Sequence, residues 1–440
     1  MSARCLKPMS KPVRKILLIN LHSSQNAGDA ALLEMALHVL SVFKGAQIAL
    51  AMNEPATGPY WCDFDNVEVV LSFIGHFVSV RADRRAYWRL ENVVWGIVVS
   101  LIACLWYKIT GRLPHWLPLS WHKLLSAYAN ADIVVSCPGN IFASMGRLGM
   151  PFLASAYTVA YALMMGKPLY VLPQSIGPLK RRWERKLVRY LYSRARLVFL
   201  REPVSFRLAL EIGLDDSQLR LVPDLALAYP PARSEEAADL LEKWAGRYER
   251  PLIGVTVINR LIRQVGDDVW DRYERSMAYS LSRFLEEYGG TVIFFPQVVG
   301  PTEKEDDRVA AYRIVSQMKD PSRAVVIRER VSPSILKAAY GLTDIFIATR
   351  MHSAIFAISM EVPTLLIGYL HKMHGLAEML GMEQWYIDLS EVTESALWEK
   401  IEDLWLHRNP VKVYLKSIMP IFVNQIDSVK QIMWRDICDQ

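Results

Sequence analysis

Short apolar runs alternate along most of this chain with longer segments of helical periodicity, and this alternation restricts the folds that the chain can adopt. Each run ends in a polar or glycine-containing turn before the helical segment begins. Strands connected in this way lie parallel in a sheet, with helices covering its faces. We therefore expect an α/β protein built from two doubly wound parallel-sheet (Rossmann-like) domains that face each other across a cleft.

The alternation predicts the elements of each half of the chain. In the first half the predicted strands are residues 15–20, 48–52, 133–136, 168–172 and 197–200, and the predicted helices are residues 29–43, 152–165, 181–193 and 203–212. In the second half strands are predicted at 252–257, 291–295, 324–328, 345–348 and 364–367, with a long helix at 270–288. Residues 393–440 are predicted to be helical and to fold back on either domain.

The two halves meet at a pair of prolines followed by a charged, helical stretch at 229–251. Such a stretch is typical of a linker between domains. We expect an N-terminal domain at 1–235, which includes an apolar segment at 93–107, and a C-terminal domain at 250–440. With 440 residues, of which 52% are apolar, the chain can fill both cores.

Charge and cysteine usage exclude several classes of protein. Lys and Arg (51) outnumber Asp and Glu (45) by only 6, which does not indicate a nucleic-acid binder. The five cysteines include no CxxC pair and predict neither a disulfide framework nor a zinc ribbon. A short apolar run without a cleavage site follows the basic N-terminus. We therefore expect a cytoplasmic protein.

The segment 93–107, VVWGIVVSLIACLWY, holds no charged residue, but a membrane-spanning helix needs about 20 residues. Basic residues and tryptophans flank the segment, which favours an anionic membrane surface. They are Arg81, Arg84, Arg85, Trp88 and Arg89 before it and Lys108, Arg112, Trp116, Trp121 and Lys123 after it. Three interpretations stay open: a core helix with a basic rim, a helix lying on the inner face of the cytoplasmic membrane, and a membrane span.

Chemically capable residues follow the predicted strands at their carboxyl ends, which share one edge of a parallel sheet. In the first domain they are Asn26, Gly28, Asp29, Gly139, Asn140, Gln174, Gly177 and Arg201. In the turn NAGD at 26–29, glycine opens a helix whose free amide groups can receive an anion or a sugar hydroxyl. The alternative is that Asp29 only caps that helix.

The second domain contributes Arg350 and His352, which lie two residues apart at the exit of the predicted strand 345–348. Arginine offers a two-pronged donor to carboxylate or phosphate, and a neighbouring imidazole can act as an acid or a base. Lys372, after the next strand, is a candidate third cation. The alternative interpretation pairs Arg350 with a structural carboxylate, uses His352 as a helix cap and leaves Lys372 in solvent.

The order and spacing of these motifs give the chain a resemblance to the polysaccharide pyruvyl transferases, which covers roughly residues 16–389. The motifs are NAGD at 26–29, PGN at 138–140, QSIGP at 174–178, REPVS at 201–205, PD at 223–224, PQVVGPTEKEDDR at 296–308, TRMHS at 349–353 and YLHKMHG at 369–375. Two positions depart from the family. PGN stands where many members have GGG, and Ala30 stands where an acidic residue is usual.

The resemblance implies a GT-B-like arrangement of the domains and the transfer of enolpyruvate from phosphoenolpyruvate to a sugar as a ketal, with release of phosphate. It implies that Arg201 and Arg350 hold the phosphate and the carboxylate of the donor and that His352 is the acid. Loops of the first domain would face the saccharide acceptor, in an exopolysaccharide, a cell-surface glycan or a lipid-linked precursor. We expect no cofactor and no metal, and we interpret Asp306 and Asp307 as a structural or hydrogen-bonding pair.

Two rival functions stay open. A GT-B nucleotide-sugar glycosyltransferase would share the fold, since fold does not decide function. It needs a carboxylate pair for the ribose, and residues 362–375 offer no convincing one. A non-catalytic, membrane-associated subunit of glycan assembly would leave Arg350 and His352 without a role. The sequence indicates neither the acceptor sugar and the ketal position nor the oligomeric state.

Overall fold

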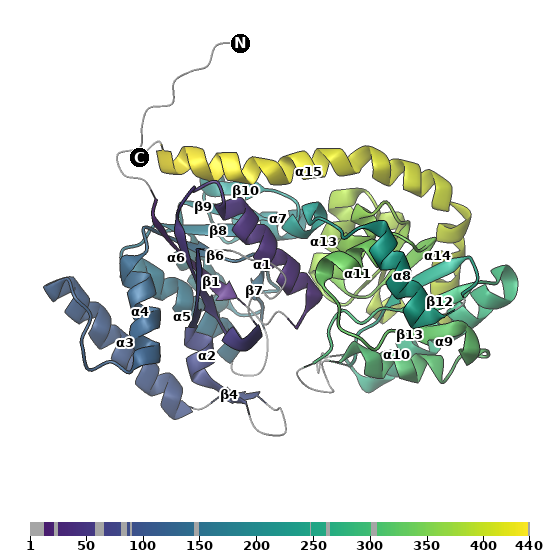
Figure 1. Ribbon diagram of the computed structural model, residues 1–440, viewed down its shortest axis with the longest axis horizontal. Coiled ribbons are helices and arrows are strands. Elements are labelled where there is room, and N and C mark those ends of the chain that lie inside the picture. Colours follow the sequence, from purple (N-terminus) through teal and green to yellow (C-terminus); the bar gives the residue numbers. More distant parts are fainter. Residues whose placement is uncertain are drawn as a thin grey trace, which may run out of the picture.

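The computed structural model describes residues 13–21, 25–57, 66–80, 86–88, 90–144, 149–246, 248–260, 265–300 and 306–438. Two parallel sheets lie side by side, each with helices packed on both of its faces (Figure 1). The two doubly wound sheets that the alternation predicts are therefore present. The limits of the two domains, 1–235 and 250–440, stay a prediction.

The N-terminal sheet has the strand order β10-β9-β8-β6-β1-β2-β3, and β7 pairs with β8 beside this path. All of these pairs are parallel. The order reverses between β1 and β6, which is where open α/β sheets bind ligands. The strands are β1 (Lys15–Leu21), β2 (Gln47–Met52), β3 (Val67–Leu71), β6 (Ile133–Ser136), β7 (Gly139–Phe142), β8 (Leu169–Ile176), β9 (Leu197–Leu200) and β10 (Leu219–Leu221).

Strand β1 shows why helices cover both faces of this sheet. Its sequence KILLINL is buried from Ile16 onward, and successive side chains alternate between two hydrophobic clusters, Ile16 and Leu18 in one and Leu17 and Ile19 in the other. The helices of this half are α1 (Ala27–Leu40), α2 (Phe73–Phe77), α3 (Leu90–Thr110), α4 (Leu119–Asn130), α5 (Met150–Met164), α6 (Arg182–Tyr192) and α7 (Pro203–Glu211). A small antiparallel pair, β4 (Val78–Val80) and β5 (Ala86–Trp88), lies outside the sheet.

The C-terminal sheet has the order β13-β12-β11-β14-β15-β16, again parallel throughout, with its reversal between β11 and β14. This is the 3-2-1-4-5-6 order of dinucleotide-binding folds. The strands are β11 (Leu252–Thr256), β12 (Thr291–Phe294), β13 (Ala324–Val326), β14 (Ile345–Ala348), β15 (Thr364–Gly368) and β16 (Tyr386–Asp388). The helices are α8 (Ser234–Ala245), α9 (Asp267–Tyr288), α10 (Asp307–Val315), α11 (Pro333–Tyr340), α12 (Met351–Ser359), α13 (His371–Leu380), α14 (Glu394–Leu406) and α15 (Arg408–Cys438).

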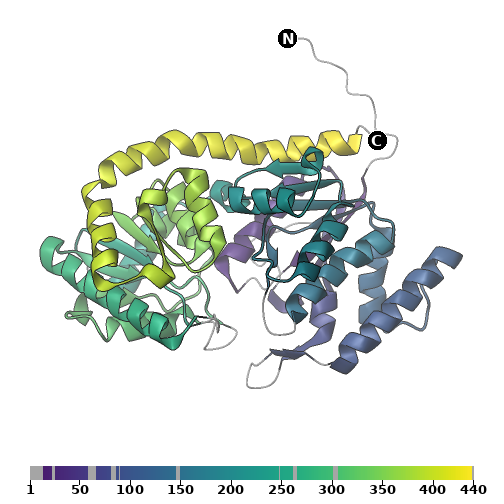
Figure 2. The same cartoon turned by 180° about the vertical axis from the view of Figure 1, so that it is seen from behind.

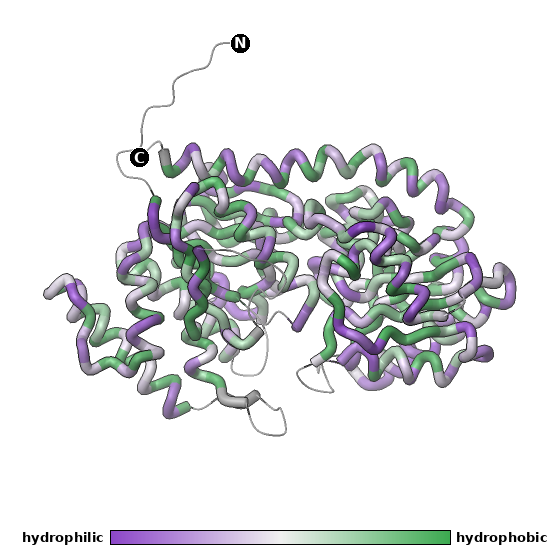
Figure 3. Tube along the Cα trace, in the orientation of Figure 1, coloured by the Kyte–Doolittle hydropathy of each residue, from purple (hydrophilic) through white to green (hydrophobic). Residues whose placement is uncertain are grey.

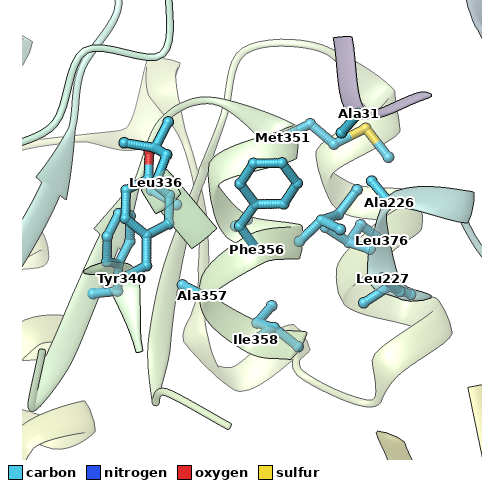
Figure 4. Close-up of a cluster of buried hydrophobic side chains, with 14 of the residues drawn as sticks. Ala31, Ala226, Leu227, Leu336, Tyr340, Met351, Phe356, Ala357, Ile358 and Leu376 are labelled. Atoms are coloured by element: carbon cyan, nitrogen blue, oxygen red, sulfur yellow. The ribbon is translucent and has the colours of Figure 1, made fainter. Parts of the chain in front are cut away.

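An apolar cluster joins the two halves beside the candidate site. Phe356 of α12 lies at its centre, between Tyr340 of α11 and residues of the first half (Figure 4). Those residues are Ala31 of α1 and Ala226 of the 3₁₀ helix η3 (Leu225–Ala228). Because close packing resists displacement, this cluster fixes the start of α1 relative to α12.

Helix α15 contacts both halves of the molecule, although the sequence predicts contact with only one of them. At its far end the hydroxyl of Tyr170 donates to Asp436 at 2.6 Å, and Trp434 packs on Phe43. Nearer its start the hydroxyl of Tyr414 donates to the carbonyl of Leu380 at 2.8 Å. Figure 2 shows the helix running along one side of both sheets.

All ten predicted strands form, but two expectations need correction. The alternation does not predict the edge strands β3, β10 and β16, which are short and partly exposed. The apolar segment 93–107 is shorter than a membrane span, but the helix that contains it is not. Helix α3 continues through polar residues at both ends and reaches 21 residues. By length and composition α3 is the one helix in the described ranges that could cross a membrane.

Candidate active site

The NAGD turn begins helix α1 and touches the second half of the molecule. Asn26 is the N-cap of α1, and its side chain accepts from the amide of Gly28 at 2.9 Å. Asn26 also pairs with Val298, and the amide of Ala27 donates to the carbonyl of Gln297 at 3.3 Å. Asn26, rather than Asp29, therefore caps the helix, and Asp29 lies half-buried in the first turn.

Gly28 lies directly against the imidazole of His352. A Cβ atom at Gly28 would lie 2.0 Å from Nδ1 and 2.3 Å from Cγ of that ring, closer than any real contact. Only glycine leaves room for the ring there. The requirement for glycine in this turn is thus steric and comes from the opposite half of the molecule.

His352, in the first turn of α12, is 9% exposed, and its Nε2 atom has no hydrogen-bond partner among the described residues. The nearest carboxylate oxygen is Oδ2 of Asp224, 3.9 Å from Nε2. Burial lowers the pKa of His352 to about 4; Asp224 opposes this shift and Arg201 adds to it. The imidazole is therefore neutral at neutral pH, and it does not cap its helix.

Arg201 is buried and held by two groups. Its Nη1 donates to Asp224 at 2.6 Å and its Nε donates to the hydroxyl of Ser175 at 2.8 Å. Asp224 thus holds the guanidinium of Arg201, and the same carboxylate oxygen lies 3.9 Å from the ring of His352 without a hydrogen bond to it. The motif PD at 223–224 is the sequence signal for this carboxylate, but the sequence does not indicate its role.

Arg350 forms the matching pair in the second half. Its Nη2 donates to Asp307 at 2.5 Å, and the other oxygen of Asp307 accepts from the amides of Val298 and Gln297. The Nε of Arg350 is buried and has no partner among the described residues. The pairing confirms that Arg350 meets a buried carboxylate, and it leaves the Nε donor of Arg350 without an acceptor among the described residues.

Asp306 and Asp307 both take hydrogen-bonding roles, as we interpret them from the sequence. Asp306 caps α10 and pairs with Arg308 at 2.6 Å, while Asp307 holds Arg350. In the ranges that the structure describes, no group of three or more His, Cys, Asp and Glu side chains could hold a metal ion.

Lys372 brings a third cation to the same place. It lies half-buried in the first turn of α13, and burial together with the positive charge of Arg201 lowers its pKa to about 8, while Asp29 opposes this shift. The neighbouring His371, which no sequence motif assigns to the site, is also affected, since burial lowers its pKa to about 4. Its only sequence signal is its place in YLHKMHG. Lys372 is therefore not a solvated surface lysine.

The two glycine turns of the first half differ in what surrounds them. Gly139, with φ +146°, has open space where a side chain would lie, and the adjacent Asn140 has a buried side-chain oxygen without a partner among the described residues. Gly177 has a φ of +98°, and a Cβ atom at this position would lie 3.8 Å from the ring of His371. Gly139 thus borders free space, whereas Gly177 packs against its neighbours.

Gln174 lies apart from the other candidates, because its amide is occupied by the protein. Its Nε2 donates to the hydroxyl of Ser136 and the carbonyl of Cys137, and its Oε1 accepts from Tyr192 at 2.7 Å. The side chain is fully buried. The structure thus gives Gln174 a supporting position in β8, paired with Gly139 at the start of β7, instead of a position that reaches a ligand.

The site as a whole joins three cations, two buried carboxylates and a neutral imidazole from turns of both halves. The cations are Arg201, Arg350 and Lys372, and the carboxylates are Asp224 and Asp307. Such a set can bind a small molecule with several negative charges and move a proton to or from it.

Comparison with known proteins relates the chain to glycan biosynthesis. The sequence model of the polysaccharide pyruvyl transferase family matches residues 26–371. The amylovoran biosynthesis protein AmsJ of Erwinia amylovora is 25% identical over 397 residues, which cover 88% of this chain and 91% of AmsJ. Every candidate residue except Lys372 lies inside the range that the family model matches.

Solved structures of GT-B fold proteins resemble the chain in fold alone. Anabaena Alr3699/HepE in complex with UDP-glucose superposes with a TM-score of 0.57 at 11% identity, covering 97% of this chain and 100% of that one. The UDP-GlcNAc 2-epimerase of Methanocaldococcus jannaschii gives a TM-score of 0.53 at 11% identity, covering 89% and 92%. The predicted fold class, two Rossmann-like domains in a GT-B-like arrangement, is confirmed.

Proposed function

The chain belongs to the polysaccharide pyruvyl transferase family, and from this premise we propose that it moves the enolpyruvyl group of phosphoenolpyruvate onto a sugar. The acceptor is a sugar of an exopolysaccharide or cell-surface glycan, or of its lipid-linked precursor, and the products are a pyruvate ketal and phosphate. The observation that carries the proposal is the convergence of Arg201, Arg350 and Lys372 on a buried imidazole across the boundary between the two halves.

The donor explains the number of cations. Phosphoenolpyruvate carries a phosphate and a carboxylate, so a site that removes it from water must replace several contacts with charge-assisted hydrogen bonds. The unpartnered Nε of Arg350 and the half-buried ammonium of Lys372 supply donors. Helices α12 and α13 both begin there without a side-chain cap, and their positive ends favour an anion.

His352 then acts as the acid, and its lowered pKa makes the proton transfer conditional on the donor. Without an anion nearby the ring is neutral. A bound phosphate and carboxylate favour the imidazolium, so the donor brings a proton onto His352 as it binds. Asp224, 3.9 Å from Nε2, stabilises the same charged form.

Each step of the reaction balances. His352 gives its proton to the methylene carbon of phosphoenolpyruvate, which makes the adjacent carbon electrophilic. A sugar hydroxyl adds there and its proton returns to His352. Phosphate then leaves with the electrons of its bond to carbon, and a second hydroxyl of the same sugar closes the ketal, its proton passing to the released phosphate. The chain supplies charge stabilisation and the acid. The reaction involves no net oxidation or reduction and therefore needs no redox partner.

The loops of the first half are suited to the acceptor. Asn140 has an unpartnered side-chain oxygen beside the free space at Gly139, and Asp29 adds a half-buried carboxylate. Such groups bind sugar hydroxyls. The similarity to AmsJ, which is named an amylovoran biosynthesis protein, supports an exopolysaccharide acceptor.

The experiment incubates purified protein with phosphoenolpyruvate and a panel of lipid-linked oligosaccharides, and it follows phosphate release and product mass. We expect one acceptor to gain the mass of a pyruvate ketal as phosphate appears. The His352→Ala variant should do neither, whereas His115→Ala, at an exposed histidine of the α3–α4 loop, should match the parent.

The same assay tests the glycosyltransferase alternative, which the fold of the UDP-glucose complex permits. Nucleotide sugars replace phosphoenolpyruvate in a second series. Transfer of a sugar from one of them, without phosphate release from phosphoenolpyruvate, would replace the proposal with that alternative.

A further inference from the structure

Helix α3 is fixed to the N-terminal domain along one face only. A Cβ atom at Gly96 would lie 2.6 Å from the ring of Trp121, so the helix backbone packs directly on α4. The hydroxyl of Ser100 lies 2.6 Å from that of Tyr157, and Tyr161 donates to the carbonyl of Ser100 at 3.1 Å. These contacts attach the middle of α3 to α4 and α5.

The opposite face of α3 is apolar and uncovered by any described residue. Its large side chains are between 41% and 75% exposed, among them Val94, Val98, Leu101, Ile102, Leu105 and Ile109. Their spacing by three, four and seven residues places them on one stripe of the helix. The helix lies at the outer edge of the molecule, away from the second sheet, and Figure 3 shows its apolar residues there. A surface of this kind marks an interaction site.

The surplus of basic residues around this stripe indicates what kind of partner covers it. Residues 81–123 contain seven Lys or Arg and two Asp or Glu, so about a tenth of the chain carries five of its six net positive charges. Lys108 and Arg112 are exposed at the end of α3 and Lys123 is exposed on the neighbouring α4, while residues 81–85 and 89 lie outside the described ranges. Apolar side chains rimmed by basic ones suit an anionic lipid surface. A second copy of the chain would bring two surfaces of the same sign together.

We propose that α3 lies in the plane of an anionic lipid bilayer, with its exposed stripe among the acyl chains and Lys108, Arg112 and Lys123 at the headgroups. With 21 residues, the helix is long enough and apolar enough to span a membrane. A span would nevertheless break the contacts of Ser100 with Tyr157 and Tyr161 and place Trp121 in water. The attached face therefore keeps α3 at the surface.

This surface goes beyond the proposed chemistry and does not depend on it. It implies that the enzyme works at a membrane, where a lipid-linked saccharide is held. Binding to lipid and turnover on a soluble acceptor are separate measurements, so each proposal can fail without the other.

The test mixes the full chain with phosphatidylcholine vesicles that contain or lack phosphatidylglycerol and measures the fraction that sediments. We expect sedimentation with the anionic vesicles alone, and release as salt rises, because ions screen the basic contacts. Combining Val94→Ser, Val98→Ser, Leu101→Ser and Leu105→Ser should lower the partition by about tenfold or more, since each loses apolar area. The matched control, Val413→Ser with Ile421→Ser, changes side chains of α15 that are 70% and 56% exposed and should bind as the parent does.

A second variant guards against misfolding of the first. Lys108→Glu, Arg112→Glu and Lys123→Glu together leave the stripe intact and should lower binding to anionic vesicles by a similar factor. The proposal is overturned if the parent does not sediment, if the four-serine variant sediments as the parent does, or if high salt and alkaline pH fail to release the protein, which would indicate a span. It is also overturned if the stripe instead forms a dimer that light scattering detects and vesicles do not compete with.

Discussion

In most proteins charged side chains lie in water and large apolar side chains lie in the core. The candidate site breaks the first of these rules and the exposed stripe of α3 breaks the second. At the site, charged groups leave water: Arg201 and Asp224 are each 1% exposed. On α3, apolar side chains stay in water, as Leu105 does with 61% of its surface exposed. Both arrangements cost folding free energy.

The difference lies in how each arrangement is completed. Each buried arginine of the site forms an ion pair with a carboxylate of the same chain. Only single atoms, such as the Nε of Arg350, lack a hydrogen-bond partner among the described residues. The stripe of α3 has no counterpart among the described residues and is completed only from outside the chain. The site is thus organised in advance for a small anion, whereas the stripe is organised for a surface.

Removing a carboxylate from the site should have the largest effect. Asp307→Ala leaves Arg350 as a buried cation and two backbone amides without their acceptor, so the free energy of unfolding should fall by about 3–5 kcal/mol. Denaturant unfolding measures it. Asp306→Ala is the matched control, since it removes only a helix cap and a half-buried ion pair and should cost about 1 kcal/mol. Equal losses for the two would mean that the buried pair is not what stabilises the site.

Replacing the acid should affect turnover rather than stability. His352→Ala should lower kcat by about 10²-fold or more while phosphoenolpyruvate still binds within a few-fold. Calorimetry in buffers of different ionisation enthalpy should also show that the parent takes up a proton as the donor binds and that the variant does not, because the free ring has a pKa of about 4. Near-normal turnover by the variant would remove His352 from the mechanism.

Replacing an arginine of the site by lysine, which keeps the charge but changes the shape of the side chain, should have a smaller effect. Arg201→Lys or Arg350→Lys loses the planar fork, so the affinity for phosphoenolpyruvate should fall by about tenfold or more in direct titrations. Arg207→Lys, at an exposed pair with Glu378, is the control and should bind as the parent does. A lysine variant with unchanged affinity would assign that arginine a structural role.

The smallest effect should come from the stripe. Each of Val94→Ser, Val98→Ser, Leu101→Ser and Leu105→Ser, made singly, should change the free energy of unfolding by no more than about 0.5 kcal/mol, because the side chains already face water. Val99→Ser, on the attached face of the same helix and 7% exposed, should cost more, about 1–3 kcal/mol. If thermal or denaturant unfolding shows equal costs on the two faces, the stripe is part of the core.

The sequence predicts the central strands well, because a parallel strand covered on both faces must be an uninterrupted apolar run, as IFIA is in β14. It does not predict β10 or β16, since LRL and YID are edge strands in which polar residues interrupt the run. The length of α3 is underestimated for a related reason. Glu91 and Lys108 end the apolar run but not the helix, because charged residues are good helix formers.

The members of the site are predictable because carboxyl ends of parallel strands share an edge, and this places Arg201 and Arg350 correctly. Their partners are not predictable, because a pairing such as Arg350 with Asp307 depends on distances between turns of different strands. The steric demand of His352 on Gly28 depends on how the two halves pack, which no local pattern records. Gln174 follows the predicted strand 168–172 just as Arg201 follows the predicted strand 197–200, yet Gln174 lies inside β8 and its amide is turned into the protein.

The contacts of helix α15 with the first sheet can form only after the rest of the chain has been synthesised. The hydroxyl of Tyr170, in a central strand of the first sheet, donates to Asp436, which is made 266 residues later. At typical rates of synthesis, roughly 13 to 50 s pass between the two. The surface of the first sheet that α15 covers in the folded protein therefore stays uncovered on the nascent chain while the whole second sheet is synthesised.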